Sequence, residues 1–333
     1  MPTDAPQGEY SVGTFTVAME DTVRSEIMTK NPDDHRKLAL QFWYPTTPHN
    51  QIRLSYYLEI VPKNVFSKMD APVVAENGPL PLVLMSHGLG GNRNHSEFIT
   101  ESLAANGYLV AGIDHTYYGG PVRFPDGSLL SSILNMLRFT GSKVTDELLA
   151  TYFDDWVVDC HWVMDELGRI NSDPDSPLYQ RIDLSRIAMV SHSFGGAMGM
   201  QCASERSDIL ATIAMDGALR GTVKDEGTTV PFMMIWPGDS ENTVDHRFDA
   251  GAFEHSPVYY WASIQNGDHG DFADHNRILK PGGTPDIHRK QDIVLQLIDG
   301  FLKHYLLGAT ASVKESLDLE QLPEVRYGEK VGR

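Results

Sequence analysis

The chain has 333 residues, of which 41% are hydrophobic and 22% are charged, as in an ordinary globular protein with one large core. Its formal net charge of −18 argues against nucleic acids and anionic membranes as partners, because both carry the same sign of charge. No segment approaches the roughly 18 consecutive apolar residues of a membrane-spanning helix, so integral membrane association is not expected.

In the N-terminal third, apolar patterns predict strands at 10–17, 37–45, 81–86 and 108–113, the last ending at Asp114. Residues 46–80 are rich in polar residues and proline, which favours loops. A helix is expected from His95 to Asn106, stopped by Gly107.

Helices and strands then alternate. A long helix is expected over residues 147–170, and a closing amphipathic helix over 292–306. Apolar runs between them predict strands at 187–190, 209–215, 230–236 and, as the last strand, 257–264. This order predicts an α/β protein with a mostly parallel sheet covered by helices on both faces, and with its site at the carboxyl ends of the strands.

We predict a single domain over residues 1–333, with two segments outside the alternation. Residues 119–146 are expected to form a small cap or lid insertion, including a short apolar helix from Leu129 to Phe139; an ordinary surface excursion is the alternative. Residues 309–333 form a polar C-terminal tail.

The compartment is predicted from the N-terminus and the cysteines. The first residues lack a charged segment followed by an apolar stretch, so no signal peptide is visible and a cytoplasmic location is expected, although a processed secreted chain would look the same. Cys160 and Cys202 fall in expected helices far apart in the sequence, which favours two buried free thiols over a disulfide.

A sharp turn is expected at Ser193, between the strand at 187–190 and a small-residue helix at 197–203. A serine at the apex of such a turn is typical of the nucleophile elbow of α/β-hydrolases. Gly195 and Gly196 allow the strand and the helix to approach closely. Ser191 departs from the usual pattern, because it stands where the motif has its first glycine.

Two backbone amides are candidates for an oxyanion hole. A glycine-rich turn, His87–Gly91, follows the strand at 81–86, and such turns supply one amide in these enzymes. The other amide comes from the residue after the nucleophile. We therefore assign the amides of Leu89 and Phe194 to the oxyanion hole.

A serine nucleophile needs a base, and the base needs a carboxylate that orients it. His269 is the expected base, because it follows the last predicted strand, whereas His192 lies beside the serine and points along the elbow. Asp216 and Asp239 each end a strand, and geometry alone does not choose between them as the acid.

The histidine lies in a segment rich in metal-ligating residue types. The aspartates and histidines of residues 268–275 resemble a list of metal ligands, but their spacing matches no known site well. Neither a metal nor a cofactor is therefore expected.

Taken together, several motifs of the chain resemble those of the platelet-activating-factor acetylhydrolase family of the plasma, group VII phospholipase type, and its microbial esterase relatives. The resemblance covers most of residues 8–306 and rests on Gly8–Gly13, Phe42–Pro45, Ser86–Gly90, His192–Gly196, Met215–Gly217 and His269–Asp274. It implies an α/β-hydrolase fold, Asp216 as the acid, His269 as the base, and Leu89 and Phe194 as amide donors. It also implies activity without metal or cofactor on small-molecule or lipid esters with short or oxidised acyl groups.

The predicted function is that of a serine carboxylic ester hydrolase, which cleaves short-chain acyl esters through an acyl-enzyme intermediate. One alternative is a cutinase-like polyester or plasticiser-ester hydrolase with an open groove and Asp239 as its acid. A lyase or perhydrolase that reuses the same triad is a second alternative. The alternative of another class is a non-catalytic ligand receptor with a hydrolase fold. The sequence predicts no oligomeric state.

Overall fold

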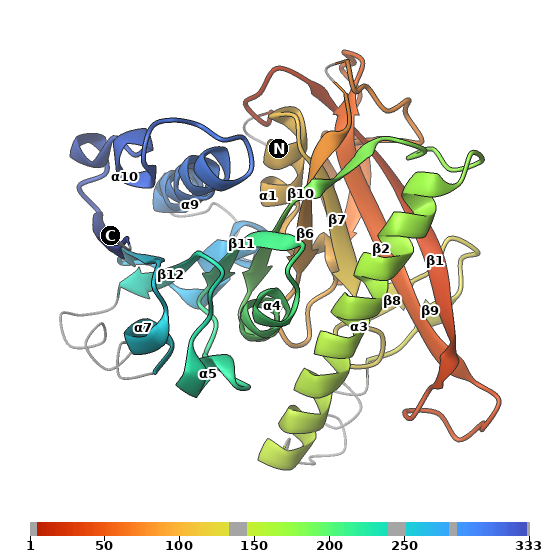
Figure 1. Ribbon diagram of the computed structural model, residues 1–333. Helices are drawn as coiled ribbons and strands as arrows, with labels where there is room; N and C mark the ends of the chain where they lie inside the picture. Colours follow the sequence, from red (N-terminus) through yellow and green to blue (C-terminus); the bar gives the residue numbers. More distant parts are fainter. Residues whose placement is uncertain (1–4, 77, 133–144, 239–250, 280–284, 332–333) are drawn as a thin grey trace.

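A ten-stranded, mostly parallel sheet forms the centre of the protein (Figure 1). The computed structural model describes residues 5–76, 78–132, 145–238, 251–279 and 285–331. Neighbouring strands from β7 to β13 pair in parallel, whereas β2 pairs antiparallel with both β7 and β1, and β14 pairs antiparallel with β13. At the edge, β5 pairs in parallel with β1. In spatial order the strands are β14 (Val325–Lys330), β13 (Tyr259–Gln265), β12 (Phe232–Gly238), β11 (Ile209–Met215), β10 (Ile182–His192), β6 (Leu80–Ser86), β7 (Leu109–Asp114), β2 (His35–Thr46), β1 (Ser11–Ser25) and β5 (Lys68–Met69).

Helices cover both faces of this sheet, as the sequence predicts (Figure 1). The helices α1 (Glu97–Ala105), α9 (Pro285–Tyr305) and α10 (Val313–Ser316) pack on one face, and α3 (Asp146–Ser172) and α4 (Phe194–Glu205) on the other. The strand β6 is buried along its whole length because alternate side chains enter the two cores. Val83 and Met85 join the first core, and Leu82 and Leu84 join the second.

Short elements complete the described chain. The hairpin of β3 (Arg53–Tyr57) and β4 (Val61–Val65) and the strand β5 lie in the segment expected to be loops, so that expectation is wrong there. The short helices are η1 (Arg93–Ser96), α5 (Val223–Glu226), α7 (Gly251–His255), η2 (His269–Phe272), α8 (His275–Leu279) and η3 (Leu319–Gln321). No helix in the described ranges has the length and apolar content to cross a bilayer.

The last strand and the segment after Leu129 differ from the sequence-based expectations. The strand at 257–264 is not the last, because β14 in the C-terminal segment pairs with β13 along the sheet edge. The short helix expected from Leu129 is wrong at its start, where Leu129 and Leu130 form β9 and pair with β8 (Val122–Arg123). Residues 133–144, which complete that expected helix, lie outside the described residues.

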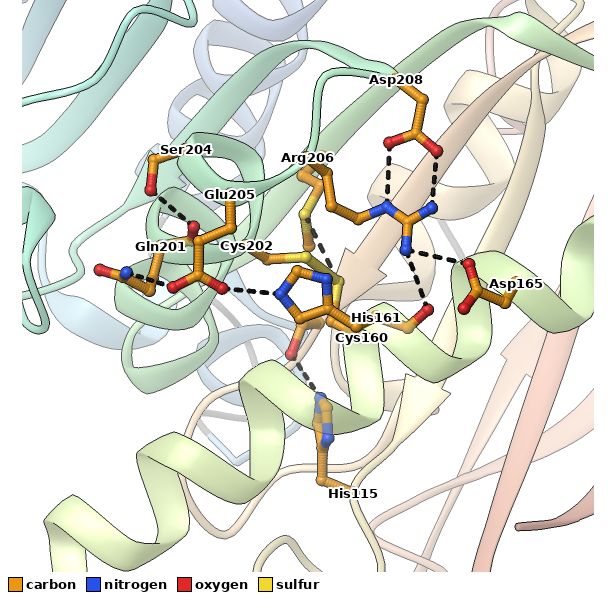
Figure 2. The surroundings of a disulfide bond; sticks show 12 residues. His115, Cys160, His161, Asp165, Gln201, Cys202, Ser204, Glu205, Arg206 and Asp208 are labelled. Carbon is orange, nitrogen blue, oxygen red and sulfur yellow. Dashed lines mark hydrogen bonds and ion pairs between the residues drawn. A yellow bond between two sulfur atoms is a disulfide. The ribbon is translucent and has the colours of Figure 1, made fainter. Parts of the chain in front are cut away.

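A disulfide joins Cys160 of α3 to Cys202 of α4, so the expectation of two free thiols is wrong (Figure 2). The two helices pack side by side on one face of the sheet, and both cysteines are fully buried there. Their separation of 42 residues hides this proximity in the sequence. The same helices are also linked at the surface, where His161 Nε2 lies 2.7 Å from a carboxylate oxygen of Glu205.

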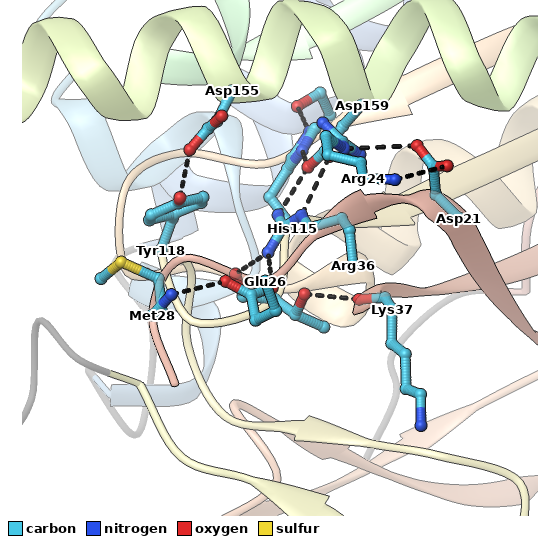
Figure 3. Close-up of polar contacts among 12 residues, drawn as sticks. Asp21, Arg24, Glu26, Met28, Arg36, Lys37, His115, Tyr118, Asp155 and Asp159 are labelled. Atoms are coloured by element: carbon cyan, nitrogen blue, oxygen red, sulfur yellow. Dashed lines mark hydrogen bonds and ion pairs between the residues drawn. The ribbon is translucent and has the colours of Figure 1, made fainter. Parts of the chain in front are cut away.

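A buried ion cluster ties the antiparallel strands β1 and β2 to α3 (Figure 3). Arg36 donates to both carboxylate oxygens of Asp159, at 3.0 and 2.6 Å, and also to Glu26 at 3.0 Å. Arg24 donates to Asp159 at 2.6 Å, and the Nδ1 atom of His115 lies 2.9 Å from the same carboxylate. Although burial favours the neutral acid, the adjacent Arg36 guanidinium holds the pKa of Asp159 below its usual range.

Reduction tests the disulfide. We expect denatured protein to take up N-ethylmaleimide only after treatment with a reductant, and then at both cysteines, as measured by intact mass. In the chain-entropy account, replacing both cysteines with alanine lowers the free energy of unfolding by about 3–4 kcal/mol relative to the oxidised protein, because the closed loop is long. Labelling without reductant would contradict the disulfide.

Removal of the Asp159 carboxylate tests the buried cluster. We expect Asp159→Asn to lower the free energy of unfolding by about 3–5 kcal/mol, because two guanidinium groups lose their buried anion. The matched control is Asp165→Asn on the same helix, whose carboxylate is 65% exposed and pairs with Arg206 at 3.1 Å. That change should cost less than about 1 kcal/mol. Denaturant unfolding compares the two, and equal losses would refute the prediction.

Candidate active site

Ser193 stands at a strained turn between β10 and α4, as the elbow motif predicts. Its backbone angles are φ 57° and ψ −122°, a region that costs non-glycine residues about 1–3 kcal/mol. The Ser193 amide donates to the Met215 carbonyl at 2.8 Å, which ties the turn to the neighbouring strand β11. Gly195 is required by close approach, because a Cβ atom there would lie 2.4 Å from the His87 carbonyl oxygen.

Ser191 fits the elbow because the facing helix has a glycine. A Cβ atom built on Gly199 of α4 would lie 3.0 Å from Ser191 Oγ, so any larger residue at 199 would crowd the serine. Ser191 is fully buried, and its hydroxyl has no hydrogen-bond partner among the described residues. Gly199 of α4 therefore leaves the space in which Ser191 replaces the usual glycine.

The glycine-rich turn lies against the serine. A Cβ atom on Gly88 would lie 2.9 Å from Ser193 Cβ and 3.4 Å from its Oγ, so the backbone of the turn passes close to the hydroxyl. The turn is closed by a hydrogen bond from the Gly91 amide to the Gly88 carbonyl at 2.8 Å, and Gly90 has a positive φ of 80°. Leu89 thus lies within a tight turn beside Ser193, and Phe194 is the first residue of α4.

Asp216 and His269 come together from the ends of two parallel strands. Asp216 follows β11 with a positive φ of 45°, and its amide donates to the Ile235 carbonyl at 2.8 Å. Its carboxylate oxygen Oδ2 lies 2.6 Å from His269 Nδ1, at the start of η2 after β13. The other candidate acid, Asp239, lies outside the described residues.

The imidazole of His269 reaches the elbow by packing on His192. The two ring centres are 4.5 Å apart, and His192 immediately precedes Ser193. Among the described residues no hydrogen bond joins Ser193 Oγ to His269, whose side chain is 56% exposed. Catalytic hydrogen bonds of this type are often long in ligand-free proteins and tighten when substrate binds.

The aspartates around His269 hold its loop in shape. Asp268 and Asp271 form a reciprocal capping box around η2, and Asn276 donates to Asp271 at 2.7 Å and also to Asp268. Lys290 of α9 lies 3.5 Å from Asp271. These contacts explain the carboxylate-rich segment that resembles a list of metal ligands. Within the described ranges no group of three such side chains is placed to hold a metal ion.

A second set of buried charges anchors the same loop from the opposite side. Asp274 pairs with Lys63 of the β3–β4 hairpin and accepts from the Glu97 amide at 3.0 Å. Glu97 in turn pairs with Lys63 at 2.9 Å and with Arg53 at 3.0 Å. Sequence reasoning missed Lys63 and Glu97, because nothing in their local pattern distinguishes them from surface charges.

Buried histidines surround the elbow and the glycine-rich turn. His192 Nδ1 lies 3.0 Å from His95 Nε2, and His115 Nε2 lies 3.0 Å from Ser86 Oγ. Ser86, His115 and Asp159 thereby repeat the order of a Ser-His-Asp triad, but all three are fully buried and no substrate reaches them. Ser86 directly precedes His87, and the His115 ring packs against the His87 ring with centres 5.5 Å apart, so the three residues support the turn. No local motif predicts this arrangement.

Burial keeps these histidines neutral. Burial and the nearby His269 ring lower the pKa of His192 to about 3. Burial and the neighbouring His115 likewise lower the pKa of His87 to about 3. An ordinary histidine has a pKa near 6.5 and gains its charge as the pH falls through that value. In the folded protein His87 and His192 stay uncharged at that pH.

The chain is similar to known esterases and acetylhydrolases. A family model described as platelet-activating factor acetylhydrolase, isoform II, matches residues 3–118, which include the glycine-rich turn but not Ser193, Asp216 or His269. The platelet-activating factor acetylhydrolase of Cavia porcellus is 24% identical over 250 residues, 67% of this chain and 57% of the relative. A probable 1-alkyl-2-acetylglycerophosphocholine esterase of Arthroderma benhamiae is 24% identical over 231 residues, 66% of this chain and 54% of the relative.

The chain spans about half the length of these curated relatives. A solved structure, the ferulic acid esterase of Streptomyces cinnamoneus, superposes with a TM-score of 0.79 at 22% identity and covers 97% of this chain and 98% of its own. The predicted α/β-hydrolase fold is thereby confirmed, as is the resemblance to platelet-activating-factor acetylhydrolases.

The neutral histidines predict how stability depends on pH. Below pH 6.5 the unfolded chain binds protons on His87 and His192 that the folded protein does not bind, so stability is lost as the pH falls from about 6.5 toward 3. Each histidine contributes a slope of about 1.4 kcal/mol per pH unit in the middle of this window. We expect His192→Asn to remove one such contribution, measured as the free energy of unfolding between pH 8 and pH 4.5. An unchanged slope in this variant would contradict the assignment.

Proposed function

We propose that this protein is a serine carboxylic ester hydrolase that cleaves short-chain acyl esters through an acyl-enzyme intermediate. The observation that carries the proposal is the 2.6 Å contact between Asp216 and His269, made beside a serine held at a strained turn. A carboxylate bonded to Nδ1 of an imidazole fixes the tautomer whose Nε2 accepts a proton. That arrangement serves a nucleophile and has no evident purpose in a protein that only binds ligands.

In the proposed mechanism Ser193 Oγ attacks the ester carbonyl while His269 Nε2 takes its proton. Asp216 stabilises the imidazolium that forms. The amides of Leu89 and Phe194 stabilise the negative charge on the carbonyl oxygen, and the position of Phe194 at the start of α4 adds the favourable end of the helix dipole. The imidazolium then protonates the leaving alcohol, and water hydrolyses the acyl-enzyme by the same route.

The preference for short acyl groups rests on the relatives. The protein of Cavia porcellus is named a platelet-activating factor acetylhydrolase, and that of Arthroderma benhamiae a probable 1-alkyl-2-acetylglycerophosphocholine esterase. A small-molecule or lipid ester is therefore the proposed substrate. The proposed roles of the triad and of the oxyanion amides require no metal or cofactor.

We propose that residues 119–146 form a cap that begins against the glycine-rich turn. The Gly120 amide donates to the Gly91 carbonyl at 2.5 Å, and Asn92 donates through its side chain to the Pro121 carbonyl at 3.1 Å. These contacts support the proposal, because they join the start of the segment to the glycine-rich turn. The cap is part of a single hydrolase domain in this proposal.

The cytoplasmic location stays a prediction. A buried disulfide such as Cys160–Cys202 is uncommon in cytoplasmic proteins, which are kept reduced. The disulfide therefore favours an oxidising compartment. This agrees with the alternative location, that of a processed secreted chain.

Substitutions in the triad test the proposed function. We expect Ser193→Ala to lower kcat for 4-nitrophenyl acetate by about 10⁴-fold or more, because the nucleophile is lost. Asp216→Asn should lower it by about 10³–10⁴-fold, because the imidazole loses its orienting charge. Ser204→Ala is the matched control on α4, since its hydroxyl only donates to the Gln201 carbonyl at 2.8 Å.

The same assay, extended to a ladder of acyl lengths and to Asp239→Asn, separates the alternatives. Loss of activity in Asp239→Asn but not in Asp216→Asn would identify Asp239 as the acid and favour the polyester hydrolase. Full activity of Ser193→Ala would refute the mechanism. A wild-type protein that neither hydrolyses esters nor reacts with a fluorophosphonate would be a ligand receptor. Triad-dependent turnover without net ester hydrolysis, as shown by product analysis, would identify a lyase or perhydrolase.

A further inference from the structure

A pocket of about 490 Å³ lies beside Phe194, next to the proposed active site. Its walls are the N-terminal half of α3, the loop that follows Asp216, and the start of α5. The ring of Phe194 packs edge-on against Phe153 of this wall, with ring centres 6.2 Å apart. Phe194 directly follows Ser193, so the pocket adjoins the residue next to the proposed nucleophile.

Two cations line this pocket. The guanidinium of Arg220 lies over the Phe194 ring, 5.7 Å from its centre, and Lys224 lines the same pocket from α5. Among the residues that the structure describes, neither side chain forms a hydrogen bond or an ion pair. The acidic residue of the lining, Asp154, is exposed on α3 and pairs with neither of them.

Cations that contact no carboxylate of the described residues are unexpected at this place, given the acidic composition. The chain has 45 acidic residues against 27 lysines and arginines, so an arginine finds a carboxylate easily. Arg206 contacts Asp165 and Asp208 at 3.1 and 2.7 Å, and Arg289 contacts Glu324 at 3.1 Å. Arg220 instead lies over the Phe194 ring and lines the pocket. An anion in the pocket would accept hydrogen bonds from its guanidinium group.

We propose that Arg220 and Lys224 form a subsite for a negatively charged group of the ester substrate, such as a carboxylate, a sulfonate or a phosphodiester. The inference rests on the proposed esterase function and narrows its substrate class. Arg220 presents the planar set of donors that matches such groups, and Lys224 adds a second positive charge. Hydrogen bonds between charged partners are stronger than neutral ones, so the subsite distinguishes charged from neutral esters.

Two matched pairs of substrates test the subsite and show which part of the ester carries the charge. For the acyl part, 4-nitrophenyl hydrogen adipate is compared with 4-nitrophenyl heptanoate, a neutral ester of similar length. For the alcohol part, 4-acetoxybenzenesulfonate is compared with 4-(methylsulfonyl)phenyl acetate. For each pair the readout is the ratio of kcat/KM for the charged ester to kcat/KM for the neutral one.

We expect Arg220→Gln to lower this ratio by about tenfold, and Lys224→Gln by about threefold, for one of the two pairs. Arg220→Lys should retain part of the ratio, because it keeps the charge but loses the planar donors. The matched control is Lys314→Gln on α10, which also removes one positive charge but is exposed on a helix that packs on the other face of the sheet. That control should leave both ratios unchanged.

The outcomes separate this inference from the function on which it rests. If the neutral esters are hydrolysed and the activity depends on Ser193, but Arg220→Gln leaves both ratios as in the wild type, the subsite is refuted and the esterase stands. If Lys314→Gln lowers the ratios as much as Arg220→Gln does, general charge explains the effect and the subsite is refuted as well. If the wild type hydrolyses neither neutral nor charged esters, the proposed function fails first.

Discussion

The contact between Asp216 and His269 depends on a chain of backbone hydrogen bonds that runs across the sheet. The amide of Ser193 donates to Met215 at the end of β11, and the amide of Asp216 donates to Ile235 in β12. Both donors belong to residues with positive φ, so each strained turn is fixed by the strand beside it. The parallel sheet therefore supplies the geometry of the site and offsets its strain.

The histidine side of the site is positioned by charges instead of by the sheet. The loop that begins at His269 is held by Lys290 on one side and by Lys63 with Glu97 on the other. Breaking one partner of such a buried pair costs far more than an exposed pair contributes. A loop at the edge of the sheet thus gains the rigidity that His269 needs to keep its ring against Asp216 and His192.

The fold and the proposed triad could be predicted because their signals are local. The elbow at Ser193, the turn at Leu89, the strand end at Asp216 and the loop at His269 each stand in a short motif with its own pattern. Partners that meet only through folding could not be predicted. Arg36 and Asp159, or Cys160 and Cys202, lie far apart in sequence, and Ser191 is explained only by Gly199 across the packed helix.

The net charge of this protein acts on a ligand at long range, whereas the charges that line a pocket act on a bound ligand. The overall charge of −18 repels anions at long range, but at physiological ionic strength that repulsion is screened beyond about 8 Å. The charged side chains that line the pocket beside Phe194 are Arg220, Lys224 and Asp154, two cations against one anion. An acidic protein therefore slows the approach of an anionic ester more than it weakens its binding, and the composition that argues against nucleic acids does not argue against a small anionic substrate.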